Sequence, residues 1–559
     1  MPQDKLYRQS IRSVVVATSL MTAGYSLAAP IDVGNPDINL RWDNTVKYSA
    51  GMRVGGQDDK LSQNAPPPAG GGAGPAALNG NDGDLNFKRG SLTSNRFDLL
   101  SEMDVTYRND FGARVSAAAW YDDVYNHDND NNSPGTNNSL SVPHNEFTHD
   151  TRDLEGRKAE LLDAFVFGGA DVGTARVSGR LGRHSVLWGE SLFFGSNAIA
   201  GTQSPVDAIK ASSVPGSTTK EIIMPVGQFS GQIQFSPALT LIGYYQYDWE
   251  ATRLPAAGSY FSANDFLGEG GERILFAPGV PNGLARASDI KGSDHGQYGL
   301  GLRSQLGEWG LGLYAIRYNA KTPTLYSRPG PTGIPGAEAG FYQWVYPEDV
   351  KAFGVSATTT VGSVNYAGEI SVRRDTPLTS LPVAVGTAEA DNNHHTFYAI
   401  GNTAHANVNM IWTMPRNFMS DEPSFSMEVA YNQLTSCTSN CSAMDPGLDR
   451  RAEAMRFLYA IPQRNVMDGL DLTPSVTAGY NHGKSPVVIM GPNKGGDMTF
   501  MLAGNYLTVW DFTMAYTHYY GAEDTGTYSS TNPSLNGTYT FAQTLKDRDF
   551  VSVSLKRTF

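Results

Sequence analysis

The feature that most constrains the fold is an alternation of apolar and polar residues, with a period of two, that starts at Arg41 and runs to Val54. Only Asn44 interrupts the apolar side, which carries Trp42, Val46, Tyr48, Ala50, Met52 and Val54. Successive side chains of a β-strand point to opposite faces, so the pattern predicts a long strand with one apolar and one charged face.

The same alternation recurs along the chain, for example over residues 96–107, 239–249, 364–372 and 425–431. We count about 18 such strands, with 16 as the alternative. The chain contains 60 glycines and 11% aromatic residues, a composition that suits strands and turns better than helices. We therefore expect an all-β protein.

The lengths of the connections alternate between short and long. Short turns are expected near 109–112, 361–364 and 504–506, whereas long polar connections are expected near 56–94 and 188–219. This is the pattern of a closed antiparallel transmembrane β-barrel with short periplasmic turns and long extracellular loops. It predicts an even number of strands and places both termini in the periplasm.

The N-terminus has the features of an export signal. Basic residues at Lys5, Arg8 and Arg12 precede a short apolar stretch, and small residues lead to Ala28. We expect residues 1–28 to be removed as a signal peptide and residues 29–559 to form one barrel domain.

The C-terminal strand alternates through Val551, Val553 and Leu555 and ends at Phe559. A last apolar strand that ends in phenylalanine resembles the signal that the barrel-assembly machinery recognises, although an ordinary last strand is the alternative. A sheet in lipid must have no free edge, because lipid cannot hydrogen-bond backbone groups. We therefore predict a protein surrounded by outer-membrane lipid in a Gram-negative bacterium.

Several blocks of the sequence resemble those of a known family. They lie at residues 160–167, 180–184 and 188–194, at Pro205-Val206-Asp207 and at the ending 545–550. They resemble the domain-of-unknown-function-1302 family of proteobacterial outer-membrane proteins. The resemblance implies a barrel that acts as a porin or as an exporter partner for apolar compounds. It supplies neither a substrate nor a catalytic residue. The chain departs from the family near Lys210, where serines replace the usual arginines, which puts an anion contact there in doubt.

The charged faces are expected to line the interior, because one lysine or arginine facing the bilayer midplane costs about 2 to 4 kcal/mol. The predicted pore-lining residues are Arg41, Lys47, Arg96, Asp98, Glu102, Asp104, Arg114, Glu369, Arg373, Glu428 and Asp511. Two interpretations remain open. These charges select a solute, or they pair across neighbouring strands and only keep the lumen hydrated.

Connection 188–219 is the best candidate for an element that folds into the pore as a constriction or plug. It is rich in small and aromatic residues and poor in charges, and its candidate residues are Trp188, Glu190, Phe193 and Phe194. In a polar lumen these aromatics need an apolar partner, either the barrel wall or a ligand. The alternative is a loop that caps the outer mouth.

Cys437 and Cys441 lie four residues apart in one predicted outer loop, where an oxidising compartment favours a local disulfide. Acidic and amide-rich tracts at 79–84 and 122–132 offer oxygen ligands for calcium, but neither completes an EF-hand, so solvated loops are the preferred interpretation. We expect no metal and no cofactor.

The net charge of −13 argues against a nucleic-acid partner. Residues 227–231 lack the spacing of a nucleophile elbow and the histidines are scattered, so we do not expect an enzyme. We expect a porin-like channel or transporter for small apolar or amphipathic solutes, with periplasmic or inner-membrane transport proteins as further partners. The alternatives are a non-transporting barrel, used for adhesion or for docking periplasmic proteins, and an outer-membrane hydrolase.

Overall fold

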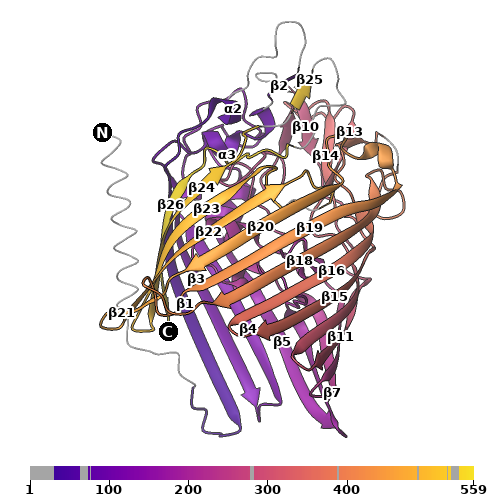
Figure 1. Ribbon diagram of the computed structural model, residues 1–559. Helices are drawn as coiled ribbons and strands as arrows, with labels where there is room; N and C mark the ends of the chain where they lie inside the picture. Colours follow the sequence, from indigo (N-terminus) through magenta and orange to yellow (C-terminus); the bar gives the residue numbers. More distant parts are fainter. Residues whose placement is uncertain are drawn as a thin grey trace.

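The computed structural model describes residues 31–62, 73–75, 77–276, 282–386, 389–487, 490–524, 527–529 and 540–559. The expected signal peptide, residues 1–28, lies outside the described residues. Eighteen antiparallel strands close into one barrel (Figure 1), which confirms the predicted fold and strand number. Within the described part of the chain, no helix is long and apolar enough to cross a membrane.

Strands that follow one another around the barrel also follow one another along the chain. The first strand, β1, closes the barrel by pairing with β26 from Thr45 opposite Thr558 to Arg53 opposite Phe550. The barrel strands are β1 (Ile38–Arg53), β3 (Leu92–Tyr107), β4 (Phe111–Asp122), β5 (Arg157–Val172), β6 (Ala175–His184), β7 (Val226–Ser236), β8 (Leu239–Gln246), β11 (Gln297–Leu306), β12 (Trp309–Tyr318), β15 (Val350–Val361), β16 (Val364–Pro377), β18 (Ile400–Thr413), β19 (Ser424–Ser439), β20 (Arg451–Ala460), β22 (Leu470–His482), β23 (Gly495–Tyr506), β24 (Trp510–Tyr520) and β26 (Phe550–Thr558).

Short and long connections alternate as predicted, with one local correction. The turn expected at 504–506 lies at 507–509, because β23 continues to Tyr506, which pairs with Trp510. Leu507 and Thr508 make this turn with φ of 55° and 58°. A short strand, β21 (Gln463–Met467), also extends the sheet beside β22.

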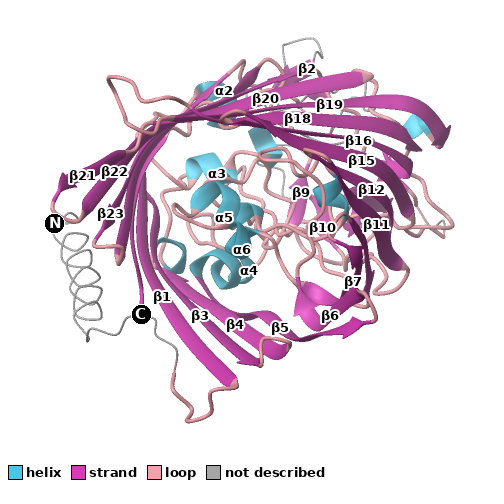
Figure 2. Cartoon of the chain, turned by 60° about the horizontal axis from the view of Figure 1, so that its bottom comes forward, coloured by secondary structure: helices cyan, strands magenta, loops and turns pink. Residues whose placement is uncertain are grey.

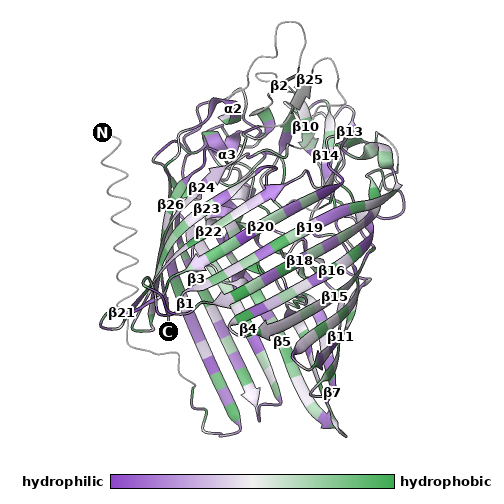
Figure 3. Cartoon of the chain, viewed as in Figure 1, coloured by the Kyte–Doolittle hydropathy of each residue, from purple (hydrophilic) through white to green (hydrophobic). Residues whose placement is uncertain are grey.

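The two faces of the strands point as the alternation predicts. On the outer face, Trp42 of β1 lies opposite Met103 of β3, and these side chains are 53% and 39% exposed. Lys47 and Asp98 lie opposite each other on the inner face of the same strands, and both are buried. Figure 3 shows hydrophobic and hydrophilic residues following one another along the strands. The exposed apolar face meets lipid, and the charged face points into the barrel.

The long loops build a cap at the extracellular end. It contains the short helices α2 (Asp59–Ser62), α3 (Asp82–Leu85) and α4 (His149–Thr151), and an aromatic core of Phe87, Tyr125, Phe147, Tyr260, Phe261 and Phe550. A separate sheet in these loops has the order β17 (Val383–Ala384), β13 (Thr324–Pro329), β14 (Gly340–Val345), β10 (Gly283–Arg286) and β9 (Arg273–Leu275). The loops expected to be solvated therefore fold into a structured cap, because their aromatic residues bury one another.

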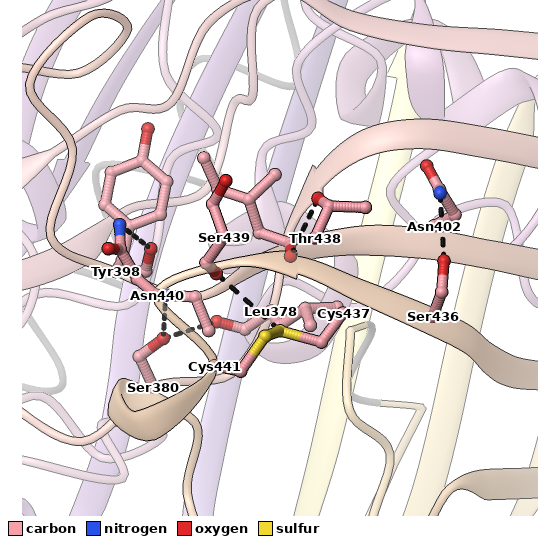
Figure 4. The surroundings of a disulfide bond; sticks show 12 residues. Leu378, Ser380, Tyr398, Asn402, Ser436, Cys437, Thr438, Ser439, Asn440 and Cys441 are labelled. Carbon is pink, nitrogen blue, oxygen red and sulfur yellow. Dashed lines mark hydrogen bonds between the residues drawn. A yellow bond between two sulfur atoms is a disulfide. The ribbon is translucent and has the colours of Figure 1, made fainter.

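The predicted disulfide between Cys437 and Cys441 is present, with an S–S distance of 2.07 Å (Figure 4). It joins the end of β19 to a single 3-10 turn, η5 (Cys441–Ala443). Between the two cysteines, Asn440 donates side-chain hydrogen bonds to the carbonyls of Thr396 and Tyr398 at 2.7 and 3.1 Å. The disulfide loop is thereby attached to the neighbouring extracellular connection.

Candidate functional site

A long segment of chain occupies the interior of the barrel. The inserted segment, residues 185–225, follows β6 and includes the helices α5 (Ala208–Ser213) and α6 (Thr219–Ile222). Figure 2 shows α5 and α6 within the ring of strands. The predicted pore element, 188–219, lies within this segment. Its first half contacts one side of the inner wall and its second half contacts another.

Aromatic and aliphatic side chains of the first half pack on the inner wall. The Trp188 ring lies 5.0 Å from the ring of Tyr244 and 5.8 Å from that of Tyr314, measured between centroids. Ile199 belongs to the same buried cluster, and Phe194 packs against Ala430 and Ala454. The barrel wall therefore supplies the apolar partner that the sequence requires for these residues.

Two carboxylates of the inner wall bind the backbone of the inserted segment. Glu428 of β19 accepts hydrogen bonds from the N–H groups of Leu192 at 3.1 Å, Phe194 at 2.9 Å and also Phe193. Glu369 of β16 accepts from the N–H groups of Glu190 at 2.7 Å and Ile199 at 2.6 Å. Hydrogen bonds to a charged group contribute about 1.5 to 3 kcal/mol each. The two glutamates therefore hold the backbone of the segment in place.

A positively charged side chain of the inner wall also binds the backbone of the inserted segment. Arg373 of β16 donates to the carbonyls of Ser196, Asn197 and Ala198 at 3.2, 2.9 and 2.8 Å. The Asn197 side chain donates to Asn407 of β18 at 2.9 Å. Glu369 and Arg373 are each 4% exposed and Glu428 is fully buried. The structure thus places these three predicted pore-lining residues beneath the inserted segment.

The second half is held at another part of the wall by charges around Trp120 of β4. Lys210 of α5 lies 4.9 Å from the Trp120 ring and 3.4 Å from the carboxylate of Glu160. Arg253 bridges Glu160 and Asp207, with a distance of 2.6 Å to each. Lys210, in the stretch where an anion contact was in doubt, is therefore engaged by a carboxylate of the protein itself.

The other predicted pore-lining charges form ion pairs. Arg114 contacts Glu102, Asp104 and Asp163 at 2.5, 3.0 and 3.2 Å. The remaining pairs are Arg41 with Asp43, Lys47 with Glu221, Arg96 with Asp98, Lys220 with Glu102, and Lys556 with Asp511. Lys220 and Glu221 belong to α6, so these pairs also attach the inserted segment to β1 and β3.

Two inner-wall arginines were missed by the analysis of the sequence. Arg180 of β6 and Arg303 of β11 are exposed within the barrel, and no ion pair involves either of them in the described residues. Alternation is weak near Arg180, where Gly182 adopts a φ of 128°, so the faces of β6 were not assigned from the pattern. The strand that carries Arg303 alternates, but it was not among the strands named from the pattern. A local signal was available for Arg180. The next residue, Leu181, is apolar and lies 52% exposed on the lipid face, so the side chain of Arg180 must point to the opposite, inner face.

One serine–histidine pair bears on the hydrolase alternative. His184 Nε2 lies 2.7 Å from Ser230 Oγ, and His184 Nδ1 lies 3.1 Å from the Gly182 carbonyl oxygen. A carbonyl therefore occupies the position of the acid in a catalytic triad. Within the described ranges, no group of three or more His, Cys, Asp or Glu side chains is arranged to hold a metal ion.

Phe559 lies at the seam where the barrel closes. Its N–H donates to the carbonyl of Asn44 at 2.8 Å, and its carbonyl accepts from the N–H of Asn44 at 3.1 Å. The last residue therefore extends the pairing of β26 with β1. Recognition of Phe559 by the barrel-assembly machinery stays a prediction.

A family model described as "Protein of unknown function (DUF1302)" matches residues 10–559. No curated protein matches the sequence. The outer membrane channel DcaP of Acinetobacter baumannii is 8% identical, with coverage of 95% of this chain and 100% of that chain and a TM-score of 0.38. OccAB4 of Acinetobacter baumannii is 10% identical, with coverage of 94% and 100% and a TM-score of 0.43.

OmpF of Salmonella typhi, in complex with daunomycin, is 8% identical, with coverage of 95% of this chain and 100% of that chain and a TM-score of 0.34. These TM-scores lie below 0.5, so the barrel is assigned from its own strand register. A closed antiparallel barrel with an apolar exterior and a charged interior is an outer-membrane protein of a Gram-negative bacterium.

Proposed function

This chain belongs to the DUF1302 family, and we propose that it is a porin-like channel for small apolar or amphipathic solutes. In this proposal the inserted segment is a fixed constriction. The observation that carries the proposal is the attachment of the segment on two sides, by Glu369, Arg373 and Glu428 on one side and by Lys210 and its partners on the other.

A constriction attached in this way limits solutes by size. To swing aside, the segment would have to give up hydrogen bonds to buried carboxylates, and an unpaired buried carboxylate is costly. Thermal motion alone does not open such a segment, so the passage available beside it stays narrow. Only small molecules are then expected to cross.

The surfaces left exposed inside the barrel are mixed in polarity. Leu187 and Leu192 of the inserted segment are 51% and 41% exposed. Thr477 of β22 and Thr499 of β23 lie opposite each other, and both are partly exposed on the inner face. Leucine side chains and neutral hydroxyl groups together favour solutes with an apolar part and a small polar part.

Conductance across a planar lipid bilayer tests the proposal. The purified, folded barrel is expected to give discrete single-channel steps in potassium chloride. In liposome-swelling assays, small amphipathic solutes should enter faster than sugars of higher mass. Folded protein that inserts into the bilayer but gives no steps and no swelling would contradict the proposal.

One observation favours the non-transporting alternative. The extracellular cap contains its own sheet, in which Tyr326 and Tyr342 are fully buried. Such an ordered outer surface suits a docking or adhesion role. The conductance measurement separates the two functions, because a closed scaffold passes no current.

We also propose that the protein is not an enzyme. The Ser230–His184 pair lacks a carboxylate partner for the histidine among the described residues. An ester-hydrolysis assay on the folded protein should therefore show no activity above that of the Ser230→Ala variant. Activity that disappears in this variant would instead support the hydrolase alternative.

A further inference from the structure

We infer that Arg180 and Arg303 form a binding site in the barrel for amphipathic organic anions, most directly for carboxylates with an aromatic or aliphatic part. This inference rests on the proposed function and deepens it by naming the charge of the solute. It begins from the contrast between these two exposed arginines and the other charged residues of the inner wall, most of which are ion-paired or bound to backbone groups.

Register places both arginines on the inner face. Arg180 of β6 lies opposite Ser230 of β7, which lies opposite Tyr244 of β8. Tyr244 contacts Trp188 of the inserted segment, so this row of residues faces the lumen. Arg303 of β11 lies opposite Thr240 of β8, four residues nearer the periplasmic turn than Tyr244. The two arginines therefore lie beside the constriction and on its periplasmic side.

Neither guanidinium is neutralised by contact. Both side chains are exposed, although the other charges on the inner wall are mostly covered. Among the residues that the structure describes, no carboxylate lies within ion-pair distance of either one. A cation in a lumen with low-dielectric walls attracts anions more strongly than it would in open solvent.

The surroundings add an apolar component to the site. The Arg180 guanidinium lies 5.4 Å from the centre of the Phe165 ring, and the Phe167 ring lies 6.3 Å from that of Phe165. Both phenylalanines are partly exposed. Gln232 of β7, also exposed, lies on the strand next to Arg180, two residues from its partner Ser230, and supplies a neutral amide. An organic anion can place its apolar part on the phenylalanines while its carboxylate binds a guanidinium.

One acidic residue opposes this site. Glu190 of the inserted segment interacts electrostatically with Arg303, but among the described residues the two side chains form no ion pair. Glu190 therefore weakens the positive potential at Arg303 without neutralising it. Its removal should increase the preference for anions, in the direction opposite to removal of an arginine.

Reversal potentials across a planar bilayer with a potassium chloride gradient test the site. The wild-type channel is expected to prefer chloride, the Arg180→Gln/Arg303→Gln double variant to lose this preference several-fold, and Glu190→Gln to increase it. Arg416→Gln is the matched control, because Arg416 lies in a periplasmic turn with its side chain 81% exposed and paired with Asp421. Unchanged selectivity in a double variant of normal conductance would overturn the inference and leave the proposed channel intact.

A second experiment tests the site without measuring conductance. It measures the equilibrium binding of a fluorescent aromatic carboxylate to the folded barrel in detergent. Loss of charge-assisted hydrogen bonds should weaken binding in the double variant by about tenfold or more. Unlabelled benzoate should compete better than acetate, and benzylamine should not compete. Equal binding by the wild type and the double variant, or equal competition by benzoate and acetate, would overturn the site. Folding of each variant is checked by its heat-modifiable electrophoretic mobility.

Discussion

The N–H group of Phe194 donates a 2.9 Å hydrogen bond to the carboxylate of Glu428, which lies 234 residues further along the chain. This contact joins the inserted segment to β19 across the interior of the barrel. Through such contacts the inner wall, which in an open barrel would be bathed in water, is partly covered by protein. In the proposed channel, the size of the passage then depends on how firmly the segment is held.

Replacement of Glu428 by alanine should loosen the constriction. Three backbone N–H groups lose their acceptor, and each charged hydrogen bond contributes about 1.5 to 3 kcal/mol. We expect Glu428→Ala to raise the single-channel conductance and the current noise, with a smaller effect for Glu428→Gln. Glu453→Gln, at an exposed position of β20, serves as the control. Equal conductance in wild type and Glu428→Ala would show that the segment does not limit the passage.

Replacement of Arg53 by alanine should destabilise the extracellular cap. The fully buried Arg53 side chain contacts the carboxylates of Asp84 at 2.7 Å and Asp547 at 3.0 Å. Removing one partner of a buried ion pair costs about 3 to 5 kcal/mol, because the other charge is left uncompensated.

We therefore expect faster cleavage of the cap of Arg53→Ala by added protease. Arg108→Ala is the matched control, because Arg108 and Asp37 form a solvent-exposed pair at 2.9 Å, and such pairs contribute about 0 to 1 kcal/mol. If both variants are cleaved at the same rate as the wild type, the buried pair does not hold the cap together.

The cap should become less stable as the pH rises. Burial raises the pKa of Asp82 to about 7, and burial together with the neighbouring Asp82 carboxylate raises the pKa of Asp265. In the unfolded chain the pKa of these carboxyl groups is about 3.9. From about pH 4 to the folded pKa the folded cap holds more protons than the unfolded chain, so its stability falls as the pH increases through this window.

Hydrogen exchange of residues 79–86 checks this expectation. Protection should be greater at pH 5 than at pH 8 in the wild type, and the difference should shrink in Asp82→Asn. Asp128→Asn, at an exposed position in a neighbouring loop, should retain the full difference. Greater protection at pH 8 than at pH 5 in the wild type would show that the stability of the cap rises with pH, contrary to the prediction.

Removal of Phe559 should reduce assembly of the barrel. The deletion removes two backbone hydrogen bonds between Phe559 and Asn44 at the closing seam, along with the aromatic residue expected to be recognised during assembly. We expect less folded protein in the outer membrane. Phe559→Tyr, which keeps the backbone and an aromatic ring, is the control. If the deletion accumulates to wild-type levels, Phe559 is not an assembly signal.

The barrel itself was accessible from the sequence because its signals are local. Trp42 and Lys47 fall on opposite faces because side chains alternate along a strand, and the positions of the turns follow from interruptions of that alternation. The exception at 504–506 was an error of three residues at one strand end. The disulfide of Cys437 and Cys441 was also accessible, because its two cysteines are close in sequence.

The sequence by itself determined the closed barrel, its approximate number of strands and the inward direction of charges such as Glu369 and Glu428. Only the tertiary structure decided which inward charges are covered and which, like Arg180 and Arg303, stay exposed. The physical reason is that an inner-wall side chain is covered only where another part of the chain, such as the inserted segment or the cap, packs against it. That packing depends on contacts between distant residues, such as Ile199 with Glu369 and Phe194 with Glu428, which are 170 and 234 positions apart, and periodicity within a strand is insensitive to such contacts.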